Sequence, residues 1–175
     1  ALFVPPATAS EFAQLEIADM ETTGQLAAVV IGDYGERWTL EALIRAVRWL
    51  MQVASPALVA LGMTRYWRAA DGLRLDTAPF VTALEHATGQ QAVVLGKPAV
   101  PFFETALGLL GASAAETDMV GDDLCSDIGG AQAAGVRGLL VRTGKFRPVD
   151  LSGDTRPAAT LESVADLPAW WRDPA

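Results

Sequence analysis

The chain has 175 residues, with 13 basic and 21 acidic side chains, a formal net charge of −8 and a pI near 4.5. Hydrophobic residues make up 51% and charged residues 19%, so the chain can bury a core and is not a disordered polymer. The acidic balance argues against nucleic acid as a partner, because phosphate binding requires an excess of lysine and arginine.

Rare residue types narrow the chemistry further. The single cysteine, Cys125, cannot form an intrachain disulfide, which favours a reducing cytoplasm. The single histidine, His86, excludes a zinc site built from several histidines. The apolar runs at 26–31 and 57–61 are far shorter than the ~20 residues of a spanning helix, so no membrane partner is expected. We therefore expect the chemistry to lie with carboxylates, amines and hydroxyls.

The first half of the chain alternates apolar strands with helices. Strands are predicted at 1–4, 26–31, 57–61 and 65–67, helices at 10–17, 40–51 and 77–87, and a turn at Asp71–Gly72. Thr39 is placed to cap the helix at 40–51. Its 3.6-residue spacing predicts a buried face made of Leu40, Leu43, Ile44, Val47, Leu50 and Met51.

The second half is more regular. Strands are predicted at 92–95, 117–120 and 136–141, and helices at 98–110 and 126–134, with a last short helix within 161–171. The stretch 147–157, rich in proline, glycine and aspartate, is typical of a surface loop. Strands that alternate with helices through short connections predict an α/β fold with a parallel sheet.

The most distinctive segment is Gly121-Asp122-Asp123-Leu124-Cys125-Ser126-Asp127, which directly follows a predicted strand. Carboxylates at the carboxyl end of a parallel strand lie at the edge where α/β sheets bind ligands. A bound cation offsets their mutual repulsion, and all-oxygen ligands favour Mg²⁺. The alternative is structural: Asp122 and Asp123 are also typical turn residues, and Asp127 suits the first turn of a helix. The spacing alone leaves both interpretations open.

Lys97 is the second candidate, because lysine occurs only at positions 97 and 145. It follows a predicted strand and Gly96, and Pro98 then opens a helix. Lys97 should therefore project from the same edge as the aspartates, where an ammonium group binds phosphate or offsets a carboxylate. Taken alone, it is equally an exposed loop lysine.

Together, the Gly-Lys-Pro and Gly-Asp-Asp-x-x-x-Asp segments resemble the third and fourth motifs of the haloacid dehalogenase superfamily. Segments 67–76 and 141–145 further resemble its phospholysine phosphohistidine inorganic pyrophosphate phosphatase subfamily. The resemblance implies a Mg²⁺-dependent phosphatase of small phosphorylated compounds that acts through an aspartyl-phosphate. It implies that Asp122 ligates Mg²⁺, that Lys97 grips the phosphoryl group, and that Asp127 holds Lys97 or a metal-bound water. The role of Asp123 stays open, since relatives vary there.

The same resemblance implies a domain division: an α/β cap over residues 1–90, then the C-terminal part of a parallel, Rossmann-like core over 91–175. The family's first two motifs, which carry the nucleophilic aspartate and a phosphate-binding Ser or Thr, precede the cap and are not found in these residues. Relatives often pair through their caps, so a homodimer is expected.

Two alternatives remain. In one, Asp33 after strand 26–31 is the nucleophile and Thr64 binds phosphate, which would make a minimal enzyme. Gly35 then stands where an acid–base carboxylate is required, and Gly32 where a buried apolar residue is expected. In the other, the chain is a non-catalytic fragment or a dimerising interaction module.

Overall fold

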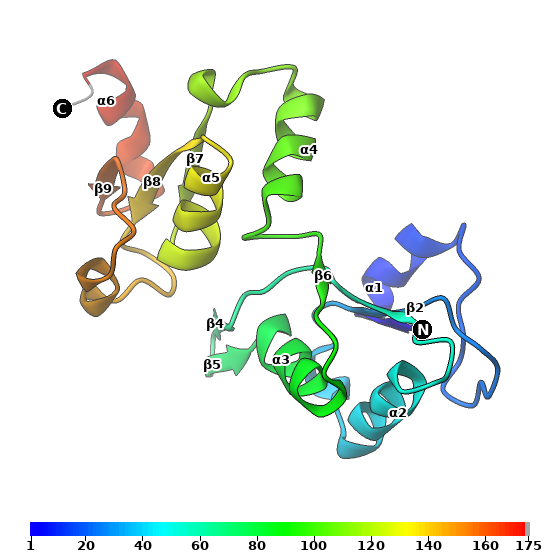
Figure 1. Cartoon of the computed structure of the whole chain (residues 1–175). Helices are drawn as coiled ribbons and strands as arrows, with labels where there is room; N and C mark the ends of the chain where they lie inside the picture. The colour runs from blue at the N-terminus through cyan, green and yellow to red at the C-terminus, as the bar shows by residue number, and fades with distance from the viewer. Residues whose placement is uncertain (174–175) are drawn as a thin grey trace. The chain divides into compact units, whose positions relative to one another are not determined.

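The computed structural model describes residues 1–173 and shows mixed α/β structure with parallel sheets, as predicted (Figure 1). The chain forms two compact units. The first contains residues 1–66 and 73–96, and the second contains residues 67–72 and the chain from 97 onward. Within the described residues, no helix has both the length and the apolar character needed to cross a bilayer.

The first unit is built on a four-stranded parallel sheet. Its strands are β1 (Leu2–Phe3), β2 (Ala28–Ile31), β3 (Ala57–Ala60) and β6 (Val93–Val94), in the order β1-β2-β3-β6. The predicted strand at the N-terminus is confirmed as an edge strand. Residues alternate along β2, so Val29 and Ile31 are fully buried while their neighbours are half-buried.

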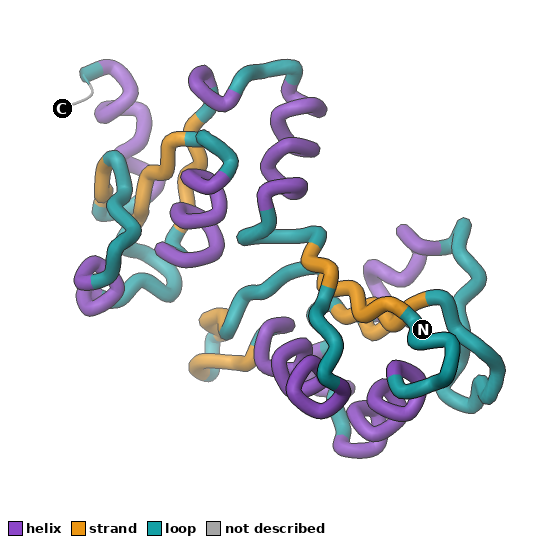
Figure 2. Tube along the Cα trace, in the orientation of Figure 1, coloured by secondary structure: helices purple, strands orange, loops and turns teal. Residues whose placement is uncertain are grey.

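Helices α2 (Leu40–Leu50) and α3 (Thr77–Thr88) pack side by side against this sheet (Figures 1 and 2). The Thr39 side chain accepts a hydrogen bond from the Ala42 N–H at 3.1 Å and so caps α2, as predicted. Asp76 caps α3, and Gly89 ends it in the left-handed conformation. Helix α1 (Pro6–Ala9) and the 3₁₀ turn Ser10–Phe12 replace the longer helix predicted at 10–17.

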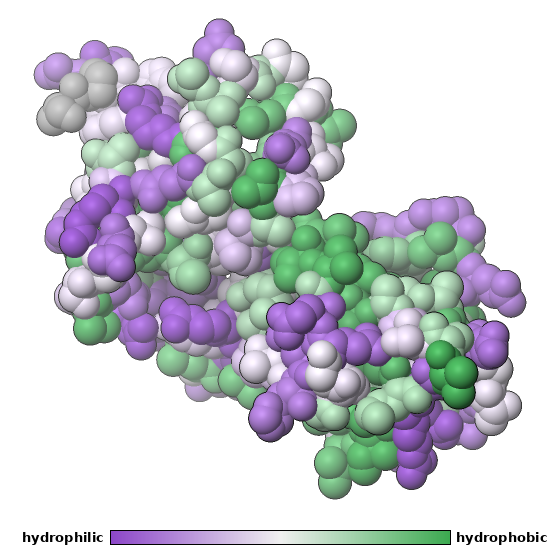
Figure 3. Space-filling view, in the orientation of Figure 1, coloured by the Kyte–Doolittle hydropathy of each residue, from purple (hydrophilic) through white to green (hydrophobic). Residues whose placement is uncertain are grey.

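The predicted buried face of α2 is correct for Leu50, which is buried, and for Leu43 and Val47, which pack partly buried against the core, and wrong for the other three residues. The helix buries Ala42, Ala46, Trp49 and Leu50, whereas Leu40, Ile44 and Met51 are 75%, 41% and 64% exposed. The two alanines carry little side-chain volume, so this face can approach the sheet closely. Figure 3 shows apolar surface, drawn green, in the region of α2 and α3.

Strands β4 (Tyr66–Ala69) and β5 (Gly72–Leu75) pair with each other and are joined by the turn at Ala70–Asp71. Residues 67–72 of this hairpin group with the second unit, although the residues on either side of them group with the first. The turn was expected at Asp71–Gly72, one residue later in the chain. Gly72 has φ +137°, a conformation that L side chains rarely adopt.

The second unit contains a three-stranded parallel sheet, β7 (Asp118–Gly121), β8 (Arg137–Val141) and β9 (Ala159–Leu161), in that order. Its helices are α4 (Val100–Leu110), α5 (Gly130–Ala133) and α6 (Leu167–Arg172). A π-helical segment, η4 (Leu124–Gly129), precedes α5, where a regular helix from 126 to 134 was predicted. Strand β9 was not predicted, because its three residues, Ala-Thr-Leu, are too few to show a pattern.

The cap of α2 provides a test of this fold. We expect Thr39→Ala to lower the free energy of unfolding by about 1 kcal/mol, because the Ala42 N–H then loses its intramolecular acceptor. Thr39→Ser keeps the hydroxyl and should stay close to the wild type. Urea denaturation followed by circular dichroism measures both variants, and equal losses in the two would contradict the capping role.

Candidate active site

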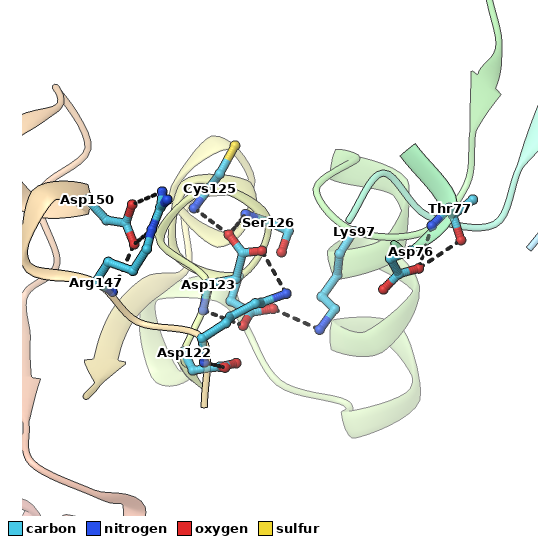
Figure 4. A network of polar contacts seen from close by, with 11 residues as sticks. Asp76, Thr77, Lys97, Asp122, Asp123, Cys125, Ser126, Arg147 and Asp150 are labelled. Atoms are coloured by element: carbon cyan, nitrogen blue, oxygen red, sulfur yellow. Dashed lines mark hydrogen bonds and ion pairs between the residues drawn. The ribbon is translucent and has the colours of Figure 1, made fainter. Parts of the chain in front are cut away.

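The predicted functional residues of the second unit lie close together, at the carboxyl end of β7 (Figure 4). Asp122 follows this strand directly, Asp123 is the N-cap of η4, and Asp127 lies within η4. Lys97 is brought to the same place by the loop between β6 and α4. The structure thus joins residues that are 30 positions apart in the sequence.

Lys97 and Asp127 form an ion pair. The Lys97 Nζ lies 2.7 Å from the Asp127 Oδ1, and the Asp127 side chain is only 6% exposed against 36% for Lys97. The other Asp127 oxygen, Oδ2, accepts a hydrogen bond from the Asp123 N–H at 3.1 Å. Because both carboxylate oxygens are held, Asp127 fixes the direction of the ammonium group while the lysine keeps contact with solvent.

Gly121 makes this arrangement possible. A Cβ at position 121 would lie 2.3 Å from the Asp127 Oδ2 and 2.5 Å from its Cβ. Any side chain there would therefore displace the buried carboxylate. The absence of a side chain at Gly121 thus leaves room for the Asp127 carboxylate.

Asp123 has a different set of contacts. Its Oδ1 accepts hydrogen bonds from the N–H groups of Cys125 and Ser126, at 2.9 and 3.0 Å, and so caps η4. Its Oδ2 lies 2.9 Å from the Lys145 Nζ, and both side chains are nearly buried. Burial alone raises the pKa of Asp123, but the bonds from Lys145 and Ser126 outweigh it and lower this pKa to about 2.

Asp122 has no ion-pair partner among the described residues, and its Oδ2 accepts a hydrogen bond from the backbone N–H of Lys145 at 2.8 Å. The ammonium groups of Lys97 and Lys145 thus offset Asp127 and Asp123, and the charge of Asp122 is left uncompensated. A single carboxylate of this kind is a suitable ligand for Mg²⁺. This cation prefers oxygen ligands, commonly takes one or two carboxylates, and completes its shell with water and phosphate. Within residues 1–173 no group of three or more acidic, histidine or cysteine side chains is placed to hold a metal. The residues therefore fit part of a Mg²⁺ shell.

Residues 143–145, the Gly144 loop, complete the site and were not assigned a role from the sequence. The register pairs Gly121 of β7 with Leu140 of β8, so the segments that follow the two strands emerge at the same edge. The sequence offers one signal for this loop. Two consecutive strands of a parallel sheet align their carboxyl ends, so the residues that follow each of them are expected at the same edge.

The residues of the minimal-enzyme alternative lie in the first unit. Asp33 and Thr64 follow the adjacent strands β2 and β3 in the first unit, and Asp33 is exposed and bonds the Gly35 N–H at 3.1 Å. His86 lies exposed in the last turn of α3, and Cys125 is exposed at the start of η4.

The lowered pKa of Asp123 predicts a pH dependence of stability. Above its unfolded pKa of 3.8 the carboxylate is ionised in both states, and the folded state gains the contacts to Lys145 and Ser126. As pH falls from about 4 towards 2, only the unfolded chain takes up the proton, so about 2 kcal/mol of stability is lost. We expect Asp123→Asn to be less stable than wild type at pH 5 and to converge with it near pH 2.

Urea denaturation at pH 5, 4, 3 and 2 measures this difference. Asp33→Asn, which changes an exposed carboxylate of the first unit, is the matched control and should track the wild type. A constant gap between Asp123→Asn and wild type over this range would contradict the argument.

Comparison with known proteins gives this site a context. Residues 94–167 match the HAD-hydrolase-like family model, a range that contains Lys97 and all three aspartates. The human phospholysine phosphohistidine inorganic pyrophosphate phosphatase is 42% identical over 149 residues, which are 85% of this chain and 53% of the relative. The bovine haloacid dehalogenase-like hydrolase domain-containing protein 2 is 49% identical over 123 residues, covering 70% of this chain and 47% of the relative.

A solved structure agrees with these relatives. The 4-nitrophenylphosphatase from Thermotoga maritima superposes with a TM-score of 0.80 at 25% identity, over 95% of this chain and 62% of that protein. The chain thus spans about half the length of the curated relatives that it matches. Residues 94–167 thus match the HAD-hydrolase-like family, and the relatives and the shared fold show that most of the chain is similar to haloacid dehalogenase-like hydrolases.

Proposed function

We propose that this chain forms part of a Mg²⁺-dependent phosphatase that acts on small phosphorylated compounds through an aspartyl-phosphate. The proposal rests above all on the Lys97–Asp127 pair beside an uncompensated Asp122 carboxylate, within a chain whose relatives are named as phosphatases. In it, Lys97 and Asp127 are the catalytic residues that this chain supplies, Lys97 also binds the substrate, and Asp122 is the metal ligand.

Lys97 binds the transferring phosphoryl group in this proposal. One of its three N–H donors is taken by Asp127, and the other two can donate to phosphate oxygens. Because Asp127 is buried and held at both oxygens, the ammonium group is oriented before substrate binds. Such preorganisation stabilises the charge that develops on the oxygens during transfer.

Asp122 supplies one carboxylate oxygen to Mg²⁺, with phosphate and water as further ligands. When bound, Mg²⁺ polarises the phosphoryl oxygens and neutralises part of their charge. The Lys145 N–H holds the Asp122 Oδ2, which leaves Oδ1 as the oxygen for the metal.

The nucleophilic aspartate comes, in this proposal, from polypeptide outside these 175 residues. Strand β7 carries the acidic loop, and among the described residues it pairs only with β8. Its free edge suits one more parallel strand, whose carboxyl end would reach the same site. On α4, Leu109 and Leu110 are 85% and 68% exposed, an apolar surface that further core structure can cover.

We assign the first unit as the cap that selects the substrate. The predicted division at residue 90 lies close to the end of this unit at Gly96. The names of the relatives suggest phosphoramides, inorganic pyrophosphate and aryl phosphates as the first compounds to test.

The test uses two proteins: this chain alone, and a fusion in which the segment of the human relative that carries the family's first two motifs precedes it. With Mg²⁺ and p-nitrophenyl phosphate, we expect turnover from the fusion and none from the chain alone. Lys97→Met and Asp122→Asn should each lower kcat of the fusion at least about 100-fold, since each removes charge stabilisation from the transition state.

The matched control is Asp33→Asn in both proteins, which should change nothing in the fusion. Turnover by the chain alone that vanishes in Asp33→Asn would contradict the proposal and support the minimal-enzyme alternative. Unchanged turnover in Lys97→Met would remove this lysine from the mechanism.

We also propose a homodimer that forms through the first unit. An apolar groove of about 410 Å³, the α2–α3 groove, lies between the two helices. Contiguous exposed apolar surface of this kind is typical of interaction sites. The residues that line it are Leu40, Leu43, Ile44, Val47, Arg48, Ala83, Leu84 and Ala87.

Light scattering tests the dimer. The wild-type chain of 18.4 kDa should give about twice that mass, and Ile44→Lys should give the mass of the monomer, because a charge in the groove is costly to bury. Val53→Lys changes an exposed apolar residue that does not line the groove and should stay dimeric. A monomeric wild type across a wide concentration range would contradict the dimer.

A further inference from the structure

The Gly144 loop holds Asp122 in one orientation. The Lys145 N–H donates to the Asp122 Oδ2 at 2.8 Å, and Gly144 adopts φ +63°. A Cβ at Gly144 would lie 2.0 Å from the same oxygen, so only glycine allows the loop to pass so close. The carboxylate therefore rests directly against the backbone of this loop.

Arg68, on β4, holds the other side of the same peptide group. Its Nε donates to the Gly144 carbonyl oxygen at 2.8 Å, across 76 positions of sequence. The Gly144 C=O and the Lys145 N–H belong to one planar peptide unit and point in opposite directions. Fixing the direction of the carbonyl therefore fixes the direction of the N–H that holds Asp122.

Charge strengthens this arrangement. The guanidinium group withdraws electron density from the Gly144 carbonyl, and bonds in such a chain reinforce one another. The resulting N–H is a better donor to Asp122, whose charge no ammonium group offsets among the described residues. Partners of a metal ligand act in this way, by fixing its orientation.

We propose that Arg68 is a positioning residue for Asp122 and acts through the Gly144–Lys145 peptide group. The inference rests on the proposed function, in which Asp122 is the metal ligand. It assigns a role in the metal site to the β4–β5 hairpin, whose residues 67–72 group with the second unit.

The test uses the ¹⁵N-labelled chain and two variants. Arg68→Met removes the donor but keeps an unbranched side chain. Arg65→Met is the matched control, because Arg65 is an exposed arginine three positions away whose guanidinium lies over the Tyr66 ring. Amide exchange and the proton shift of the Lys145 N–H report on its hydrogen bond. Line broadening by added Mn²⁺ at residues 121–127 reports on metal binding, even when that binding is weak.

For Arg68→Met we expect an upfield shift of the Lys145 N–H and faster exchange at this amide. The Mn²⁺ concentration for half-maximal broadening should rise about tenfold, as is typical when a partner of a metal ligand is lost. The melting temperature of Arg68→Met should equal that of Arg65→Met, because both arginines are exposed. Arg65→Met should leave the Lys145 amide and the Mn²⁺ response unchanged.

The proposal is overturned if Arg68→Met leaves the Lys145 amide unchanged, or if Arg65→Met alters it equally. If Mn²⁺ broadens none of residues 121–127 in the wild type, the metal assignment of the proposed function fails. The Lys145 amide then still decides whether Arg68 orients the peptide group that holds Asp122.

Discussion

Three carboxylates crowd the end of β7, and their compensation by two lysines is the constraint on which the site depends. Asp127 and Asp123 are nearly buried, and each has its own ammonium partner, Lys97 and Lys145. Buried carboxylates without such partners would take up protons or drive the loop apart. Because Lys97 precedes the three aspartates in the sequence and Lys145 follows them, forming the site requires segments on both sides of β7 in the sequence to come together.

Close backbone approach is the second requirement. Gly121 makes room for the Asp127 carboxylate, and Gly144 makes room for that of Asp122. Gly130 has a similar role, since a Cβ there would lie 2.8 Å from the Cα of Pro98. Glycines thus allow three segments to come within hydrogen-bonding distance of one another: Lys97 with Pro98, residues 122–127, and the Gly144 loop.

The sequence predicted most of the elements because their signals are local. The Thr39 cap depends on a few neighbouring residues, and the structure confirms it. Gly89 and Gly111 end α3 and α4 through the same kind of local signal. The predicted face of α2 was wrong at Leu40, Ile44 and Met51, because periodicity cannot tell which of two neighbouring apolar stripes is buried. Here Ala42 and Ala46 are buried instead. Strand β9 was missed because its pairing with β8 is a long-range property.

The site was predictable in part. The spacing of the acidic motif and its resemblance to a known family drew attention to Lys97, Asp122 and Asp127, and in the structure Lys97 and Asp127 form an ion pair. The contacts of Asp123 and Asp122 with Lys145, and of Gly144 with Arg68, join separate parts of the chain. No local pattern encodes them.

Calorimetric titration of Mg²⁺ into the fusion protein tests the central claim, that Asp122 binds the metal while Asp123 is held by Lys145. We expect Asp122→Asn to lose most of the Mg²⁺ affinity without unfolding, and Asp123→Asn to keep an affinity close to that of the wild type. Loss of binding in Asp123→Asn together with retained binding in Asp122→Asn would contradict the assignment.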